Sequence, residues 1–334
     1  MTRKEAAPYG GLEYSKSLRA EFGPNSEHVD MALYYRDEAP IIGYENNSVE
    51  YVHFKAEVDP EAEATTPPVF YVPGFTEGVV AKAPLGISLT EGGRSVIMPE
   101  QNRKGILRDR DGKKNATYTQ AMQALSIIEQ EGLTDETVDF VTHSYGSVVL
   151  EEMVNEAEHR GWTCFEDSKV AMLAPAGLRH EKLPSYAKRF LHDISSTGSS
   201  EKDIEDHAFK YGVKNFLRNI PRTIREVLEM RRTKIDVAQM KKLGGIASVH
   251  VLSHAEDKIF SSSVDAETDY RDAVVGSSIE GYITDESIDG WSAPVDFDAV
   301  AEGRMSYGGE HAEHNDEQFF PRRSARAILQ LLKD

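Results

Sequence analysis

Short apolar runs, separated by stretches of helical periodicity, make up the middle of this chain. Nearly uninterrupted runs of this kind are typical of strands buried in a parallel sheet. They are Val69–Val72, Val96–Met98, Val138–Val141 and Lys169–Ala174. Between them, residues 118–131 and 148–156 place apolar side chains three and four positions apart. The alternation predicts an α/β fold with a mostly parallel central sheet and helices on both faces.

The first part of the chain has a weaker pattern. Met31–Tyr35 is apolar enough to form a first strand. Val49–Ala56 alternates between apolar and polar residues, which is typical of an edge strand.

Residues 179–245 interrupt the strand pattern. Apolar residues recur there at helical spacing, and Pro221 suits the first turn of a helix. The strand pattern returns at Ala247–Ser253, and Ser324–Leu332 has the period of a closing helix. We therefore expect a helical cap inserted into the α/β core.

The predicted organisation has three parts. Residues 1–48 form an N-terminal extension, residues 49–178 and 246–334 form the core, and residues 179–245 form the cap or lid. The extension and the acidic stretch 265–300 have no functional assignment from the sequence.

Charge narrows the choice of partners. The chain has 38 Lys and Arg against 56 Asp and Glu, a net charge of −18. A nucleic-acid partner is therefore not expected, since phosphate backbones require a basic face. The cap differs, with 15 Lys and Arg against 9 Asp and Glu. This excess would suit an anionic or amphipathic substrate or a membrane surface; the alternative is a solvated face docked on an acidic body.

Cysteine content and hydropathy bear on the compartment. Cys164 is the single cysteine, so no internal disulfide can form, which suits a reducing compartment. Residues 1–11 lack the apolar segment of a signal peptide, and no apolar run reaches 18 residues. We expect a cytoplasmic protein without a membrane span.

The stretch Val138–Val149 carries the most specific chemical signal. An apolar strand leads to a tight turn with Ser144 at its apex and Gly146 two residues later, and an amphipathic helix follows. This is the layout of a nucleophile elbow, which presents a serine hydroxyl beside the unpaired N–H groups of a helix N-terminus. Thr142 stands where the usual Gly-x-Ser-x-Gly pattern has its first glycine. The alternative is a buried strand that happens to end in His-Ser-Tyr-Gly.

A second stretch of interest follows the strand at Val69–Val72. This strand stops at Pro73-Gly74 and opens into a loop through Phe75. Such a loop can point backbone N–H groups into a site; the alternative is an ordinary turn at the end of a strand.

From about Val69 to its C-terminus, the chain resembles the α/β-hydrolase family. Four features agree in order: the strand before Pro73-Gly74-Phe75, the elbow, a loop with Asp257 after a later strand, and a His-rich loop before the last helix. Nucleophile, acid and then histidine is the order of that family.

The resemblance implies a role for each of these residues. Ser144 would be the nucleophile, His314 the base that takes its proton, and Asp257 the carboxylate that orients the imidazole. The backbone N–H groups of Phe75 and Tyr145 would bind the oxyanion of the tetrahedral intermediate.

His311 competes with His314 for the role of base. His314 is followed by Asn-Asp, as in the loop of that family, although Glu313 replaces the usual glycine. His311 follows two glycines and a glutamate. We favour His314. The two imidazoles are also spaced to share a metal ion, but no thiolate or His-Glu-x-x-His accompanies them, so no metal or cofactor is expected.

Together these features predict a serine hydrolase that cleaves a small carboxylic ester through an acyl-enzyme on Ser144. Thioesters, peptides and lysophospholipids are alternative substrates for the same mechanism. A non-catalytic binding protein of the same fold is the alternative function.

Overall fold

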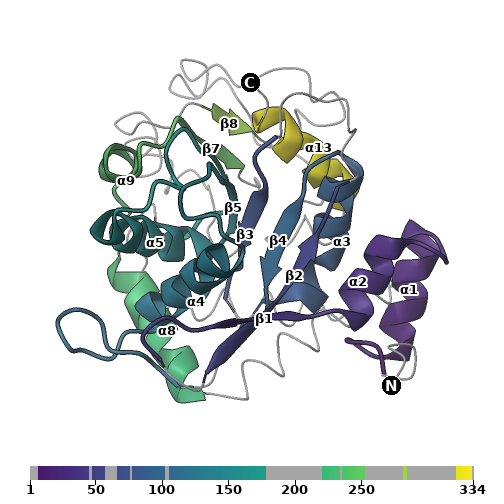
Figure 1. The fold of residues 1–334 in the computed structure, drawn as a ribbon, viewed down its shortest axis with the longest axis horizontal. Coiled ribbons are helices and arrows are strands. Elements are labelled where there is room, and N and C mark those ends of the chain that lie inside the picture. Colours follow the sequence, from purple (N-terminus) through teal and green to yellow (C-terminus); the bar gives the residue numbers. More distant parts are fainter. Residues whose placement is uncertain are drawn as a thin grey trace, which may run out of the picture.

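A single twisted sheet forms the centre of the protein (Figure 1). The computed structural model describes residues 7–44, 47–56, 66–75, 77–101, 105–177, 220–233, 235–252, 281–283 and 321–332. Within these ranges the sheet has eight strands in the order β1-β2-β4-β3-β5-β6-β7-β8. The strands are β1 (Asp37–Pro40), β2 (Ser48–Phe54), β3 (Val69–Val72), β4 (Val96–Pro99), β5 (Asp139–His143), β6 (Lys169–Leu173), β7 (Ser248–Leu252) and β8 (Gly281–Ile283).

Most neighbouring strands run parallel. The pairs from β4 through β3, β5, β6 and β7 to β8 are parallel, and only the pairs β1–β2 and β2–β4 are antiparallel among the described strands. The prediction of a mostly parallel sheet is therefore confirmed.

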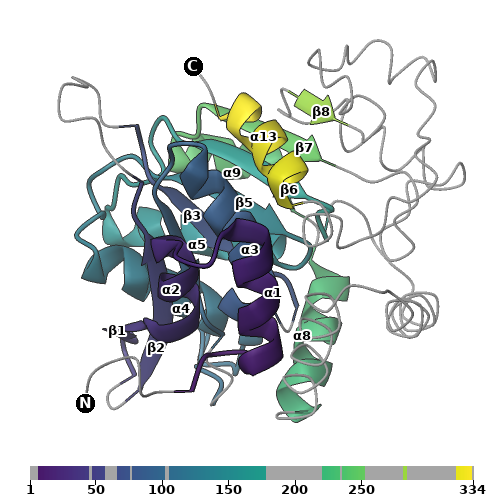
Figure 2. The same cartoon turned by 90° about the vertical axis from the view of Figure 1, so that its right-hand side faces the viewer.

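Helices cover both faces of the sheet, as predicted. The described helices are α1 (Leu12–Phe22), α2 (Glu27–Tyr34), α3 (Val79–Glu91), α4 (Ala116–Gln130), α5 (Gly146–Arg160), α8 (Ile220–Arg232), α9 (Val237–Gly244) and α13 (Pro321–Leu331). Figure 1 shows α4 and α5 on one side of the sheet and α3 on the other. Figure 2 shows α3 and α13 together on the second face, with α1 below α13.

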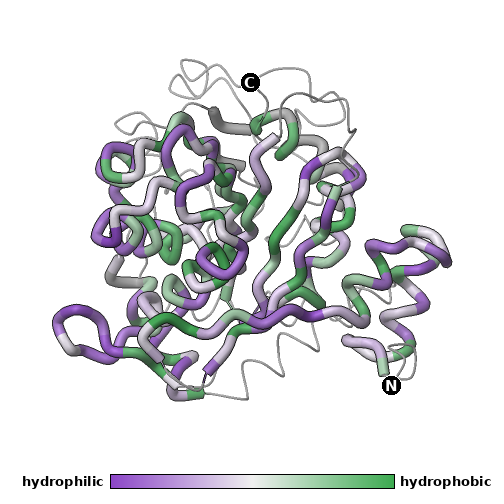
Figure 3. The backbone as a smooth tube through the Cα atoms, viewed as in Figure 1, coloured by the Kyte–Doolittle hydropathy of each residue, from purple (hydrophilic) through white to green (hydrophobic). Residues whose placement is uncertain are grey.

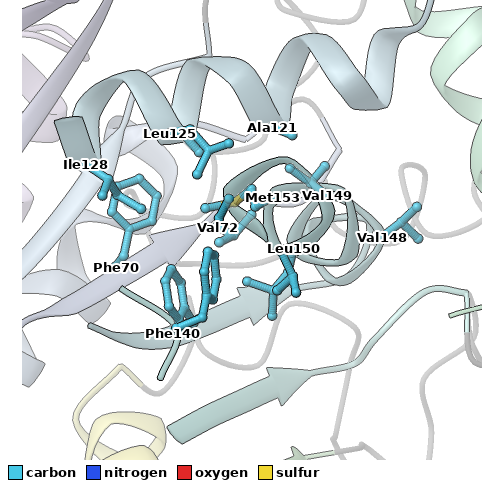
Figure 4. Close-up of a cluster of buried hydrophobic side chains, with 14 of the residues drawn as sticks. Phe70, Val72, Ala121, Leu125, Ile128, Phe140, Val148, Val149, Leu150 and Met153 are labelled. Atoms are coloured by element: carbon cyan, nitrogen blue, oxygen red, sulfur yellow. The ribbon is translucent and has the colours of Figure 1, made fainter. Parts of the chain in front are cut away.

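The first face is packed mainly by apolar contacts. Strands β3 and β5 are buried along their whole length, because each lies in the middle of the sheet and is covered by helices. Figure 4 shows Phe70 and Phe140 of these strands meeting side chains of α4 and α5. The Phe140 ring also stacks on Phe165, with centroids 4.5 Å apart. In Figure 3 the central strands are mostly hydrophobic, whereas hydrophilic segments lie in the outer helices and loops.

The second face is built around α3 and α13. Their buried apolar residues join those of β4, α1 and α2 in a second cluster. Tyr14 of α1 is fully buried and donates its hydroxyl to the carbonyl of Val80 in α3, 2.5 Å away. The N-terminal helices are thereby attached to the same face.

Two predictions for the first 56 residues were wrong in part. Met31–Tyr35 is not a strand, because these residues end α2, whose N-terminus Ser26 caps by accepting from the Val29 N–H. Strand β2 was predicted correctly, but it is not at the edge, since the short strand β1 pairs outside it. Only Ala39 is buried in β1, so this strand lacks an apolar pattern.

The predicted cap, residues 179–245, lies largely outside the described residues. Of this range the structure describes α8 and α9, and α8 begins one residue before Pro221, as the sequence suggested. The closing helix was also predicted correctly and is α13. The stretch 265–300 contains one described strand, β8.

Strand β5 begins with a buried carboxylate. Asp139 is 3% exposed, and its Oδ2 lies 2.6 Å from Nη2 of Arg94, itself buried. Its Oδ1 accepts from the backbone N–H of Lys169 on β6, 2.7 Å away. The carboxylate thus joins the N-terminal ends of two strands and the turn that precedes β4.

We expect Asp139→Ala to lower the free energy of unfolding by about 3–5 kcal/mol, because it leaves the buried Arg94 without its carboxylate. Urea denaturation provides the measurement. Asp37→Ala, which removes an exposed aspartate from β1, is the matched control and should change the value by less than about 0.5 kcal/mol. Equal effects of the two substitutions would contradict a structural role for the buried pair.

Candidate active site

Ser144 lies at a strained turn between β5 and α5. Strand β5 ends at His143, α5 begins at Gly146, and the Ser144 φ angle is 51°. A non-glycine residue seldom adopts this left-handed conformation, which costs of order 1–3 kcal/mol and is typical of functional sites. The elbow predicted from the sequence is present.

The end of β6 holds the backbone of Ser144 in place. The Ser144 N–H donates to the carbonyl of Leu173 at 2.9 Å, and the Ala176 N–H donates to the Ser144 carbonyl at 3.0 Å. Between them, Ala174 also has a positive φ angle, 40°. The strain at Ser144 is therefore supported by two hydrogen bonds from the neighbouring strand.

The two positions of the motif that flank Ser144 have different steric demands. A Cβ atom on Gly146 would lie 2.2 Å from the carbonyl oxygen of Val72, so only glycine fits there. Thr142 is fully buried, and its hydroxyl lies 2.7 Å from that of Ser147. The departure from glycine at Thr142 is thus accommodated by a hydrogen bond between β5 and α5.

The Pro73–Phe75 segment lies beside this elbow. Val72 pairs with Thr142 in the parallel β3–β5 register, so the two segments that follow leave the same edge of the sheet. The rings of Phe75 and Tyr145 meet edge to face, with centroids 6.5 Å apart. The two residues expected to donate to an oxyanion are therefore neighbours.

Tyr145 also contacts the cap side of the molecule. Its N–H precedes the first turn of α5 and so has no acceptor within that helix. Its hydroxyl lies 2.6 Å from that of Thr117, which donates to Glu229 of α8 at 3.2 Å. Burial raises the pKa of Tyr145 well above 10, so the phenol stays neutral.

A buried ionic cluster lies directly behind the Pro73–Phe75 segment. Glu77 Oε1 is 2.6 Å from Nδ1 of His143 and 3.1 Å from Nζ of Lys82. Glu77 Oε2 accepts from the Gly74 N–H at 2.6 Å and from the Tyr71 hydroxyl at 3.2 Å. This cluster was not predicted, because glutamate, lysine and histidine at these positions belong to no sequence motif.

The charge balance of the cluster favours an ionised Glu77. Burial alone would raise the pKa of its carboxyl group, but the charges of His143 and Lys82 and the Gly74 N–H outweigh burial and hold the pKa below its ordinary value. His143 follows Thr142 along β5, so the two side chains point to opposite faces of the sheet. Hence His143 faces α3 and the glutamate, although it is next to Ser144 in sequence.

The expected acid and base lie outside the described residues. Asp257 comes five residues after β7, and His311 and His314 come between β8 and α13. The register pairs Leu252 with Leu173, the residue that holds Ser144, so β7 ends at the same edge of the sheet as the elbow. Asp257 therefore follows, in the sequence, a strand that ends at this edge of the sheet.

The histidines that the structure describes have partners elsewhere. His28 contacts the Lys55 carbonyl and His53 contacts Glu131. The remaining three lie near other groups: His143 at Glu77, His159 at the Asn155 carbonyl and His250 at Ser248.

Other chemistry is limited in the part of the chain that the structure describes. No group of three His, Cys, Asp or Glu side chains there is placed to hold a metal ion. Cys164 is buried, and burial raises its pKa to about 12, so its thiol is unreactive at neutral pH. Of the helices in the described ranges, none combines the length and apolarity needed to cross a bilayer.

Comparison with known proteins identifies the fold. No family model and no curated protein matches the sequence. Among solved structures, a thermophilic esterase from Thermogutta terrifontis is similar over 90% of this chain and 100% of its own, with 12% identity and a TM-score of 0.53. A membrane phospholipase A, described as a bacterial virulence factor, is similar over 95% of this chain and 91% of its own, with 12% identity and a TM-score of 0.59.

A third structure carries the name of the fold. An α/β-hydrolase fold protein from Chitinophaga pinensis is similar over 90% of this chain and 97% of its own, with 12% identity and a TM-score of 0.55. The chain therefore has the α/β-hydrolase fold, as its sequence motifs suggested.

We expect Glu77→Gln to lower the free energy of unfolding at pH 7 by about 3–5 kcal/mol, because the buried Lys82 ammonium would lose the carboxylate that lies 3.1 Å from it. The folded-state pKa of Glu77 is lowered, so its contribution is present above the unfolded value near pH 4.3 and is lost as the pH falls below it. The difference between wild type and variant should therefore shrink below about pH 4 in urea titrations.

The matched control for this prediction is Glu13→Gln. Glu13 is 61% exposed and pairs with Lys16, so its substitution should cost less than about 1 kcal/mol. A Glu77→Gln variant that resembles this control at pH 7 would show that the cluster contributes no net stability.

Proposed function

We propose that the protein is a serine hydrolase that cleaves carboxylic esters through an acyl-enzyme on Ser144. The observation that carries the proposal is the geometry of Ser144: a left-handed residue at a strand-to-helix turn, braced by β6 and beside the N-terminus of α5. A fold alone does not define a function, but a strained serine in this position has a chemical use.

In the proposed reaction, His314 takes the proton of the Ser144 hydroxyl as the oxygen attacks the ester carbonyl. Asp257 holds the imidazole in the required tautomer and stabilises its charged form. The alcohol leaves with the proton that the imidazole returns. Water, activated by the same imidazole, then hydrolyses the acyl-enzyme and regenerates Ser144.

The negative oxygen of each tetrahedral intermediate would accept hydrogen bonds from the backbone N–H groups of Phe75 and Tyr145. The Tyr145 N–H lies at the N-terminus of α5, where the helix dipole favours negative charge. The two residues lie in contact, which supports a shared oxyanion site. Removal of one such donor typically costs roughly 10²–10³ in kcat.

The similar structures and the charge of the cap support a class of substrate. Two of the similar structures are named as an esterase and a phospholipase A, and these names support an ester bond as the target. The excess of basic residues in 179–245 supports an anionic or amphipathic ester.

The single cysteine supports the cytoplasm as the compartment. A chain with one cysteine forms no internal disulfide, which suits a reducing environment.

We expect Ser144→Ala to lower kcat for a short-chain aryl ester by roughly 10⁴-fold or more, because the nucleophile is absent. A fluorophosphonate should label the wild-type protein at Ser144, and the variant should not be labelled. Intact-mass spectrometry and a peptide map provide the measurement.

Ser17→Ala, on α1, is the matched control and should keep both the activity and the label. A folded wild-type protein that neither cleaves the ester nor accepts the label would instead favour the non-catalytic binding protein.

We expect Asp257→Asn and His314→Ala each to lower kcat by roughly 10³-fold or more, because each disables proton transfer from Ser144. His311→Ala should stay within a few-fold of wild type and serves as the control. The reverse result for the two histidines would assign the base to His311. Full activity in both histidine variants would contradict a triad that takes its base from this loop.

A further inference from the structure

One side chain outside the proposed triad sets the orientation of the peptide that joins Gly74 to Phe75. Gln101 lies two residues beyond the end of β4, which is the neighbour of β3 in the sheet (Figure 1). Its Nε2 donates to the carbonyl oxygen of Gly74 at 2.6 Å. The hydrogen bond thus joins the segment after β4 to the segment after β3, its neighbour in the sheet.

The geometry of the peptide group gives this contact a consequence for Phe75. The Gly74 carbonyl and the Phe75 N–H belong to one planar trans peptide and point in opposite directions. A hydrogen bond that fixes the carbonyl therefore also fixes the direction of the N–H. It also polarises the amide, which strengthens the N–H as a donor.

The peptide on the other side of Gly74 is fixed as well. The Gly74 N–H donates to Glu77 Oε2 at 2.6 Å, and the contacts of Glu77 Oε1 with His143 and Lys82 hold that carboxylate. A Cβ atom at Gly74 would lie 2.9 Å from both Glu77 Oε2 and His143 Nδ1. A side chain at this position would displace the glutamate or the histidine, so glycine allows the backbone to approach the cluster this closely.

We propose that Gln101 is a positioning residue of the oxyanion site: it aims the Phe75 N–H at the substrate oxygen through the Gly74 carbonyl. This inference rests on the proposed function of Ser144 and Phe75. Gln101 acts through the backbone and touches no reacting atom. It is half-buried and lies in a loop rather than in the apolar core, so its substitution is compatible with folding.

Two substitutions test the donor separately from the shape. Gln101→Glu keeps the size of the side chain but replaces the N–H donor with an acceptor that faces the Gly74 carbonyl. Gln101→Leu removes the polar group. For each, kcat for an aryl ester should fall about tenfold or more, as part of the 10²–10³ that loss of a whole oxyanion donor costs. KM should change less than about twofold, because the donor acts mainly in the transition state.

A transition-state analogue distinguishes a misdirected Phe75 N–H from a general loss of activity. A trifluoromethyl ketone forms a tetrahedral adduct with the serine and places an oxyanion in the same site. Its affinity should fall by the same factor as kcat/KM in both Gln101 variants. Gln130→Leu, the same substitution at an exposed position at the end of α4, is the control and should leave both values unchanged.

The outcomes distinguish this inference from the proposed function. An active wild-type protein with unchanged kcat and analogue affinity in both Gln101 variants would overturn the inference and leave the hydrolase proposal standing. A loss confined to KM or to the thermal midpoint would also overturn it, since that indicates binding or stability. A wild-type protein without ester hydrolysis or fluorophosphonate labelling would overturn both.

Discussion

The close passage of the first turn of α5 beneath the end of β3 determines the geometry of the candidate site. The parallel register pairs Val72 with Thr142, and the chain must then turn within three residues to start a helix. At Gly146 the helix backbone comes so near the Val72 carbonyl that no Cβ fits. The turn therefore has little room, and Ser144 adopts a left-handed conformation that its hydrogen bonds to β6 maintain.

The two faces of the sheet bury different polar groups at the end of β5. Strand β5 sends Thr142 and His143 to opposite faces, so the elbow helix packs through a small hydroxyl pair while the ionic cluster forms on the α3 side. A buried charge is costly unless it has partners. Glu77 has four: Lys82, His143, the Gly74 N–H and the Tyr71 hydroxyl. The cluster thereby fixes the loop after β3, which has no regular structure to fix it.

Sequence patterns predicted the strands whose side chains are buried and apolar. They missed the elements that depend on a helix cap or on pairing with another strand. The runs in β3, β4, β5 and β6 are apolar because the middle of a parallel sheet is covered on both faces, so their period was readable. The second half of α2 was predicted as a strand because its apolar residues stand close together, whereas the helix is marked by the cap at Ser26, five residues before Met31. Strands β1 and β8 were missed because neither contains an apolar run like those of β3 and β4: β1 reads Asp-Glu-Ala-Pro, and β8 reads Gly-Tyr-Ile.

The same division holds at the site. Ser144 and Tyr145 were predicted because the elbow motif fixes their spacing. Phe75 was predicted from the strand that ends at Pro73-Gly74 and from the family resemblance. Gln101 and Glu77 were not, since what makes them significant is a contact with Gly74 that only the folded sheet creates. For Asp257, His311 and His314 the assignment stays a prediction.

The attachment of α8 explains why a large aromatic residue follows the serine. Glu229 accepts hydrogen bonds from the N–H groups of Ala116 and Thr117, where the dipole of α4 favours a negative charge. Thr117 in turn contacts the Tyr145 hydroxyl, and the Tyr145 ring meets Phe75. A smaller residue at 145 would still supply the backbone N–H at the start of α5. It would not reach Thr117, and the Pro73–Phe75 segment and helix α8 would lose their common support.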